Sequence, residues 1–180
     1  DAALVTGGHR EISAGDGEIL RNARRVFLRG ICKHEEHPAL GASNPSWLAS
    51  QDLELIRELG ANYVRTAHYP HSPVELALAR EMGLMVAEEV PFYQAGNGIM
   101  HWYSDRRPLS EFPLRLFGRR QLRRRALTAN AQRQLLEMVE RDRNNPAVIM
   151  WGIANEAYTL GRSSARYYRR LSALVRSFDP

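Results

Sequence analysis

Short apolar runs alternate along the chain with stretches in which apolar residues recur every three or four positions. The runs have the length of buried strands, and the recurring stretches have the period of amphipathic helices. Strands are expected at residues 26–31, 61–66, 84–90 and 147–154. Helices are expected at residues 46–59, at 73–82, in a segment ending near 142, and at 163–178. This alternation predicts an α/β fold in which helices cover a parallel sheet.

Serine, proline and glycine residues mark the expected ends of two helices. Ser46 follows Pro45 and is predicted to cap the first helix, which Gly60 ends. Pro73 opens the second helix, because proline suits the first helical turn, and Gly83 closes it.

Two segments fall outside the alternation. Residues 1–25 carry four glycines and are predicted to form short strands and turns that lead into the sheet. Residues 91–116 are irregular, and loops of this length in compact domains are usually functional or disordered. Residues 106–125 mix arginine with Phe and Leu, which suits a lipid surface, a phosphate backbone or an anionic sugar. Charge runs are more often solvated faces, so we expect neither nucleic-acid nor membrane binding.

Composition narrows the class of protein. The 180 residues, 44% of them hydrophobic, suffice for one domain with a core. The formal net charge is +5, and Lys33 is the only lysine, a skew that we attribute to genomic base composition. No run approaches the roughly 18 apolar residues of a membrane span, and the single cysteine, Cys32, excludes an internal disulfide. The sequence does not decide the cellular compartment, because a signal peptide on a longer chain would leave no trace here. The cytoplasm is slightly favoured.

Each predicted strand is followed by residues that can carry chemistry. In parallel α/β sheets, ligands bind at the carboxyl ends of the strands, where the loops converge. The four groups, in chain order, are Lys33-His34-Glu35, then Arg65 and His68, then Glu88-Glu89, and finally Asn155-Glu156. They predict one site at this edge of the sheet.

Four stretches resemble the catalytic barrel of glycoside hydrolase family 2, in the family's order and spacing. They read "FLRGICKHEEHPALG", "DLELIRELGANYVRTAHYPHSP", "EMGLMVAEEVP" and "ERDRNNPAVIMWGIANEA". The resemblance implies a TIM (β/α)8 barrel, of which residues 26–180 would form the first half, strands 1 to 4. Residues 1–25, including "GHREI", would lead in from a preceding β-sandwich.

The resemblance also implies a retaining mechanism, which uses two carboxyl groups about 5 Å apart. Glu156 would be the acid/base, and Asn155 would bond the sugar 2-hydroxyl. Arg65 would hold the nucleophile, while His34 and His68 would contact sugar hydroxyls.

Other interpretations of these residues stay open. Glu156 alone would suit a loop cap, and Arg65 could form a structural ion pair with Glu88 or Glu89. Trp151 would line the floor of the site or simply fill the barrel.

The family places its nucleophile after the seventh strand, and by our count this sequence holds four βα units. We therefore expect the parent protein to hydrolyse β-glucuronides, β-galactosides or β-mannosides, and the "KHE" and "EEVP" motifs favour glucuronides. The 180-residue chain alone is expected to be inactive and to self-associate or pair with the missing barrel half. The alternative is a non-catalytic α/β module that binds carbohydrate or protein.

No metal or other cofactor is expected. Residue type alone permits a metal site at His34, Glu35 and His37. Galactosidases of the family often carry a Glu and a His soon after the third strand for Mg²⁺, and "EEVPFYQAGNG" lacks that pattern. His37 and His71 are predicted to lie at the surface. Glu35 is equally compatible with a site role and with a solvated loop charge.

Overall fold

The computed structural model describes residues 8–93, 122, 124–159 and 161–180. The chain divides into two compact units. The first comprises Asp1–Glu88 and Arg141–Trp151, and the second comprises Glu89–Glu140 and Gly152–Pro180. None of the helices in the described ranges is long and apolar enough to cross a membrane.

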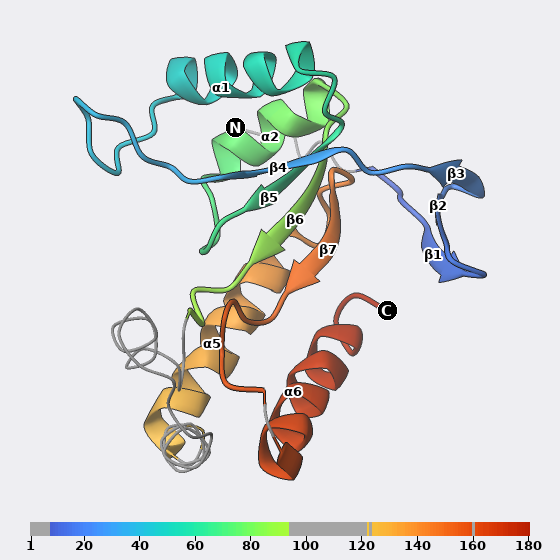
Figure 1. The fold of residues 1–180 in the computed structure, drawn as a ribbon, viewed down its shortest axis with the longest axis vertical. Coiled ribbons are helices and arrows are strands. Elements are labelled where there is room, and N and C mark those ends of the chain that lie inside the picture. Colours follow the sequence, from blue (N-terminus) through green and yellow to red (C-terminus); the bar gives the residue numbers. More distant parts are fainter. Residues whose placement is uncertain (1–7, 94–121, 123, 160) are drawn as a thin grey trace, which may run out of the picture. The chain divides into compact units, whose positions relative to one another are not determined.

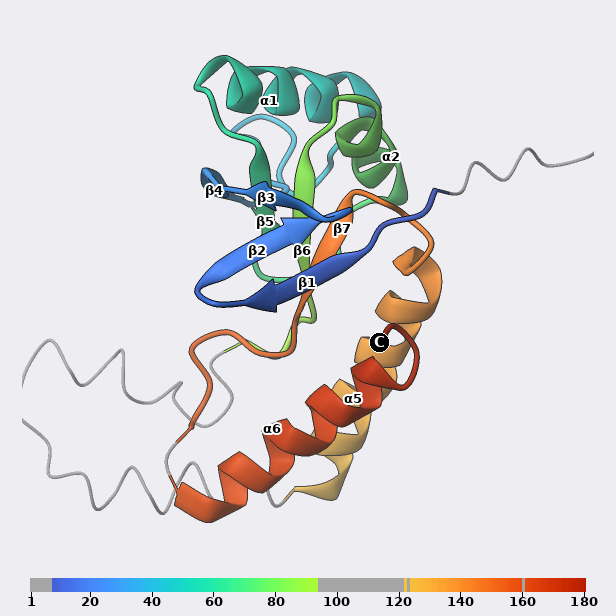
Figure 2. The ribbon, with the colours of Figure 1, turned by 90° about the vertical axis from the view of Figure 1, so that its right-hand side faces the viewer.

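The first unit begins with an antiparallel sheet of three short strands, in the order β1-β2-β3 (Figure 2). The strands are β1 (Ile12–Gly15), β2 (Glu18–Arg21) and β3 (Arg24–Val26). Both connections are two-residue turns, Asp16-Gly17 and Asn22-Ala23, and all four turn residues have positive φ. Such turns match the twist of a hairpin. The prediction of short strands and turns is confirmed for the described part of this segment, residues 8–25.

A four-stranded sheet follows, in the order β4-β5-β6-β7. Its strands are β4 (Gly30–Lys33), β5 (Tyr63–Thr66), β6 (Met85–Glu89) and β7 (Val148–Gly152). The pairs β4–β5 and β5–β6 are parallel, with Cys32 beside Arg65 and Arg65 beside Ala87. The α/β class and the sheet are therefore as predicted.

The first strand of this sheet starts later than predicted. Val26 belongs to β3, Phe27 is 72% exposed, and the strand begins only at Gly30. The intervening residues are held by a side chain: Asn62 Oδ1 accepts a hydrogen bond from Arg29 N, and Asn62 Nδ2 donates to Phe27 O. The apolar run at residues 26–31 is therefore shared between two sheets, with Val26 in β3 and Ile31 in β4. The periodicity of the sequence does not reveal this division.

Two helices of the first unit lie next to each other on the same side of the sheet (Figure 1). They are α1 (Ser46–Glu58) and α2 (Pro73–Glu81). The prediction for Ser46 was wrong, because the extended Pro45 occupies the cap position and no side chain caps α1. The start of α2 is as predicted at Pro73, and the Ser72 hydroxyl accepts a hydrogen bond from Val74 N.

Apolar side chains from α1, α2, the three strands β5–β7 and the residues just before β6 and β7 form the core between sheet and helices. The buried members are Leu53, Ile56, Val64, Leu76, Ala79, Leu84, Val86, Ala147 and Val148. Fully burying one such leucine or valine stabilises the fold by about 1.5–3 kcal/mol. This core fixes the strands whose carboxyl ends carry the candidate site.

The second unit contains most of α5 (Arg125–Asp142) and all of α6 (Gly161–Arg176). Tyr167, Leu171 and Val175 form the buried stripe of α6, and the Tyr167 ring packs 5.7 Å from the Phe92 ring. Most of the arginine-rich stretch 106–125 and of the long loop lies outside the described residues.

Candidate functional site

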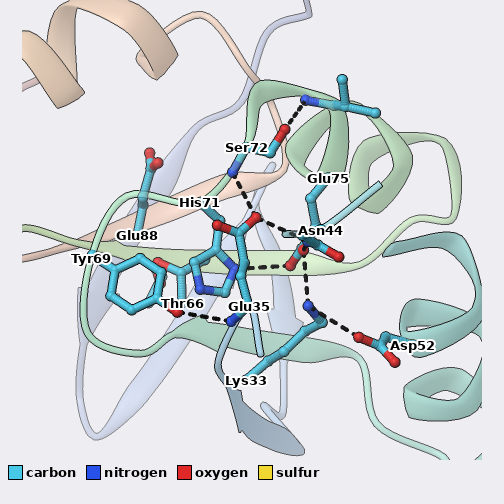
Figure 3. A network of polar contacts seen from close by, with 12 residues as sticks. Lys33, Glu35, Asn44, Asp52, Thr66, Tyr69, His71, Ser72, Glu75 and Glu88 are labelled. Carbon is cyan, nitrogen blue, oxygen red and sulfur yellow. Dashed lines mark hydrogen bonds and ion pairs between the residues drawn. The ribbon is translucent and has the colours of Figure 1, made fainter. Parts of the chain in front are cut away.

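A buried ion-pair network lies at the carboxyl end of β4 (Figure 3). Lys33, the last residue of β4, is 7% exposed. Its Nζ lies 2.9 Å from Oε2 of Glu75 and 3.2 Å from Oδ2 of Asp52. The ammonium thus joins the end of β4 to α1 through Asp52 and to the first turn of α2 through Glu75.

Glu75 is 2% exposed and remains a carboxylate. Its burial favours the protonated form, but a hydrogen bond and charge from His71, together with the Lys33 ammonium, lower the pKa of Glu75 below its ordinary value. His71 Nδ1 lies 2.9 Å from Glu75 Oε1. His71 is fully buried, so the prediction that it lies at the surface was wrong.

Glu35 forms the second centre of the network. Its Oε1 accepts hydrogen bonds from Asn44 Nδ2 at 2.9 Å and from the Ser72 backbone N–H at 3.0 Å. Asn44 Nδ2 also donates to Glu75 Oε2 at 2.6 Å, so one amide bridges both carboxylates. Glu35 N donates to the Tyr69 hydroxyl at 2.9 Å.

The two predicted sugar-contacting histidines lie together. The His34 and His68 rings are 5.2 Å apart in an edge-to-face arrangement, and the Tyr69 ring lies 6.1 Å from His34. His34 is exposed and His68 is half-buried. The carboxyl ends of β4 and β5 therefore present a pair of imidazoles, as the sequence pattern predicted for the strand ends.

Three further residues singled out from the sequence lie in the first unit: Arg65, Trp151 and His37. Arg65 is half-buried, and its Nη1 lies 4.0 Å from Cys32 Sγ on the neighbouring strand. Trp151 is half-buried and packs against the core described above. His37 accepts a hydrogen bond from Ala39 N through its Nδ1, within its own turn.

Glu88 is paired with Arg141 through an ion pair between Arg141 Nη2 and Glu88 Oε1 at 2.7 Å. Arg141 Nε also lies 2.6 Å from Asp142 Oδ2. Burial, followed by the neighbouring Asp142 carboxyl, raises the pKa of Glu88 to about 9 against the opposing effect of Arg141. The surroundings of Glu88 therefore favour its protonated form more than water does.

In the second unit, Asn155 and Glu156 follow the end of β7. Asn155 is buried, its N–H donates to Phe92 O at 3.1 Å, and it forms a parallel bridge with Tyr93. Glu156 is exposed and has a φ of 45°, a left-handed conformation that is uncommon for a residue other than glycine. Unusual backbone of this kind gathers at functional sites.

Known proteins resemble this chain in sequence and in fold. The model of the family "Glycosyl hydrolases family 2, TIM barrel domain" matches residues 12–180. The chain belongs to glycosyl hydrolases family 2. This four-stranded parallel unit is consistent with part of the family's barrel.

The curated relatives and the solved structures named here are all β-glucuronidases. A β-glucuronidase of Streptococcus agalactiae is 31% identical over 96% of this chain and 27% of its own length. A β-glucuronidase of Rattus norvegicus is 32% identical over 96% of this chain and 23% of its own length. The chain thus spans about a quarter of these relatives.

The structure of the Ruminococcus gnavus β-glucuronidase with uronic isofagomine superimposes with a TM-score of 0.82. It is 28% identical and covers 96% of this chain and 28% of that protein. The same enzyme with D-glucuronic acid gives a TM-score of 0.75. These matches support the α/β fold of the family 2 barrel.

The network was not predicted from the sequence, and one signal could have revealed part of it. Lys33 is the only lysine in a chain with 25 Lys and Arg residues, which marks its position as unusual. Among the described residues, Glu35, His71 and Glu75 could together hold a metal ion, with ligand atoms within 4.8 Å of one another. The Lys33 ammonium already supplies a cation to Glu75, so an ion there would compete with it.

Proposed function

We propose that this chain carries the acid/base part of a retaining β-glycosidase, with Glu156 as acid/base and Asn155 as ligand of the sugar 2-hydroxyl. The observation that carries the proposal is the placement of Glu156. Its exposed carboxylate follows a parallel strand, in a left-handed backbone conformation next to the buried Asn155. Membership of family 2 supports the same roles.

The substrates we propose are β-glucuronides, ahead of β-galactosides and β-mannosides. The curated relatives named above are β-glucuronidases, and the Ruminococcus gnavus structures hold uronic ligands. The chain covers only about a quarter of those relatives, so substrate identity rests on likeness and needs a direct assay.

The other proposed roles concern sugar binding and the nucleophile. His34 and His68 contact sugar hydroxyls, which fits their adjacent rings at the strand ends. Arg65 orients the nucleophile, and Trp151 lines the floor of the site or fills the barrel. We assign no nucleophile among these 180 residues, since the family places it after a seventh strand. Residues 1–25 are proposed as the lead-in from a β-sandwich, and residues 26–180 as the barrel's first half.

The chemistry follows from these roles. The Glu156 acid donates its proton to the glycosidic oxygen while the nucleophile attacks the anomeric carbon from the opposite face. The Glu156 carboxylate then accepts a proton from the water that releases the sugar. The hydrogen bond from Asn155 to the sugar 2-hydroxyl becomes stronger in the transition state. It therefore lowers the activation free energy of the reaction and does not act on KM alone.

The test uses the complete gene product and nitrophenyl β-D-glucuronide, β-D-galactoside and β-D-mannoside. We expect the glucuronide to have the highest kcat/KM. Glu156→Ala should sharply lower kcat for these nitrophenyl substrates, because release of the sugar loses its general base, whereas Glu140→Ala, a matched change at an exposed glutamate of α5, should leave kcat unchanged. Sugar binding without release of nitrophenol would favour the binding-module alternative. A kcat that Glu156→Ala leaves unchanged would remove Glu156 from the acid/base role.

A further inference from the structure

The network around Glu75 ties together the two chain segments that carry His34 and His68. Glu75 lies on α2, yet its two oxygens contact Lys33 at the end of β4, Asn44 in the β4–α1 loop and His71 in the β5–α2 loop. Each contact joins segments separated by tens of residues, except the His71 contact within one helical turn. Such a network defines the relative positions of the two loops.

His34 occupies a specific place in this arrangement. Its neighbours on both sides are fixed: the Lys33 ammonium lies between Glu75 and Asp52, and Glu35 is bonded by Asn44 and Ser72. The Glu35 backbone N–H is also bonded to Tyr69, the residue that follows His68. The exposed His34 ring therefore projects from a backbone that is anchored immediately before and after it.

The chemistry of the network fits anchoring better than ion binding. A metal on Glu35, His71 and Glu75 would lie close to the Lys33 ammonium, which is 2.9 Å from Glu75 Oε2, and the two cations would repel each other. Removing one partner of a buried pair leaves an uncompensated charge, so the network holds a single arrangement. A rigid supporting layer of this kind is what keeps contact residues in a productive geometry.

We propose that Asn44, Glu75, Lys33 and Glu35 are positioning residues, which hold the paired imidazoles of His34 and His68 against the sugar. The inference rests on the proposed glycosidase function, because the imidazoles are given their sugar contacts there. Asn44 is the best probe. Its amide links the two carboxylates, and its removal leaves the ion pair between Lys33 and Glu75 in place.

The first experiment compares Asn44→Ala with Asn144→Ala in the complete gene product, using nitrophenyl β-D-glucuronide. Asn144 is exposed and serves as the matched control. We expect Asn44→Ala to lower kcat/KM by about ten-fold or more, because it removes two hydrogen bonds to charged groups. The loss should include a higher KM, because displaced imidazoles hold the sugar less well. Partial unfolding would instead lower the active fraction and leave KM unchanged.

A double-mutant cycle with His34→Ala shows whether Asn44 acts through His34. In the His34→Ala background, Asn44→Ala should lower kcat/KM less than it does in the wild type, because only the part of its effect that acts through His68 remains. Independent, multiplying losses in the double variant would overturn the proposal. So would an unchanged KM for Asn44→Ala.

Crystal structures of the wild type and of Asn44→Ala give a readout that does not need activity. We expect the edge-to-face pair of His34 and His68 in the wild type and displaced or disordered rings in the variant. If the wild type hydrolyses none of the three glycosides, the proposed function fails, and the crystal structures still decide the positioning role. Unmoved rings in Asn44→Ala would refute it. Should Asn44→Ala fail to fold, Lys33→Met is measured in its place with the same readouts and criteria.

Discussion

A Cβ atom at position 152 would lie 2.8 Å from Cγ and 3.0 Å from Cβ of Glu89, so only glycine fits beside this side chain. Gly152 ends β7 and accepts a hydrogen bond from Val90 N, while Glu89 is 2% exposed at the end of β6. The two strand ends are therefore packed against each other three residues before Asn155. This close approach constrains the start of the segment that carries Glu156.

Gly152→Ala is expected to destabilise the protein by about 1–3 kcal/mol, the usual cost of overpacking a filled core. The near atoms belong to the base of the Glu89 side chain, so a simple rotation of its carboxylate cannot relieve the clash. Denaturant unfolding measures the change. Gly15→Ala is the matched control, because nothing lies within 4 Å of a Cβ there. Equal stability of the two variants would contradict the close packing of Gly152 and Glu89.

Glu88 is expected to make stability fall as the pH rises. Burial raises its pKa from an ordinary value of 4.5 to about 9, so the folded state binds a proton that the unfolded state releases. The stabilisation is complete below about pH 4.5 and is lost as the pH rises through about 9. Glu88→Gln keeps the shape and a donor toward Asp142 without the titration. Its melting temperature should exceed that of the wild type at pH 8 by a few degrees.

The control for Glu88 is Glu81→Gln, at an exposed residue of α2 whose contact with Arg80 spans 3.7 Å. This variant should keep the pH dependence of the wild type. The measurement is the melting temperature between pH 5 and pH 9. A wild type whose melting temperature does not decline over this range, or a Glu88→Gln variant that declines equally, would refute the assignment.

Periodicity predicted the strands and helices because burial of one face decides those elements. The start of β4 was missed because the apolar run from Val26 continues through a connection in which Phe27 is exposed. The side chain of Asn62, more than thirty residues away, holds that connection. Long-range polar contacts of this type leave no local pattern in a single sequence.

The same limit applies to the network at the site. Ser72 and Glu75 have the spacing of a capping box, in which the glutamate would bond back to the Ser72 N–H. In the structure, Glu35 accepts that N–H, and Glu75 turns to Lys33 and Asn44. The local sequence correctly predicted the start of α2. Contacts with distant residues, however, decide which groups Ser72 N–H and Glu75 bond to. The proximity of His34 and His68 could be predicted, because the carboxyl ends of neighbouring strands in a parallel sheet converge.

The 180-residue chain, expressed alone, is expected to self-associate. β4 and β7 are the edges of the four-stranded sheet, and unpaired edges promote strand pairing between molecules. Trp47, Leu55 and Leu59 on or beside α1 are each more than half exposed and add apolar surface. Light scattering at micromolar concentration gives the mass. A reductant is required, because the exposed Cys32 could form a covalent dimer.

Cys32→Lys tests whether the edge of β4 is responsible for this association. A lysine on an edge strand opposes pairing, and Cys32→Ser provides the control without the charge. We expect the lysine variant to shift toward monomer relative to the serine variant. A monodisperse wild-type monomer in reductant would contradict the prediction of self-association, and identical behaviour of the two variants would exclude pairing through β4.

Glu156→Gln in the complete gene product is expected to affect glucuronides according to their leaving groups. A poor alkyl leaving group needs a proton from Glu156, so its first step should slow by about 10²-fold to 10⁴-fold. A nitrophenyl leaving group departs without that proton, so its first step should be nearly unchanged, although loss of the general base slows release of the sugar afterwards. A burst of nitrophenol followed by slow turnover is the expected signature, and it is measured by rapid mixing. Glu140→Gln should show neither effect. Equal loss of the first step on both classes of glucuronide would exclude Glu156 as the general acid and leave it a binding residue.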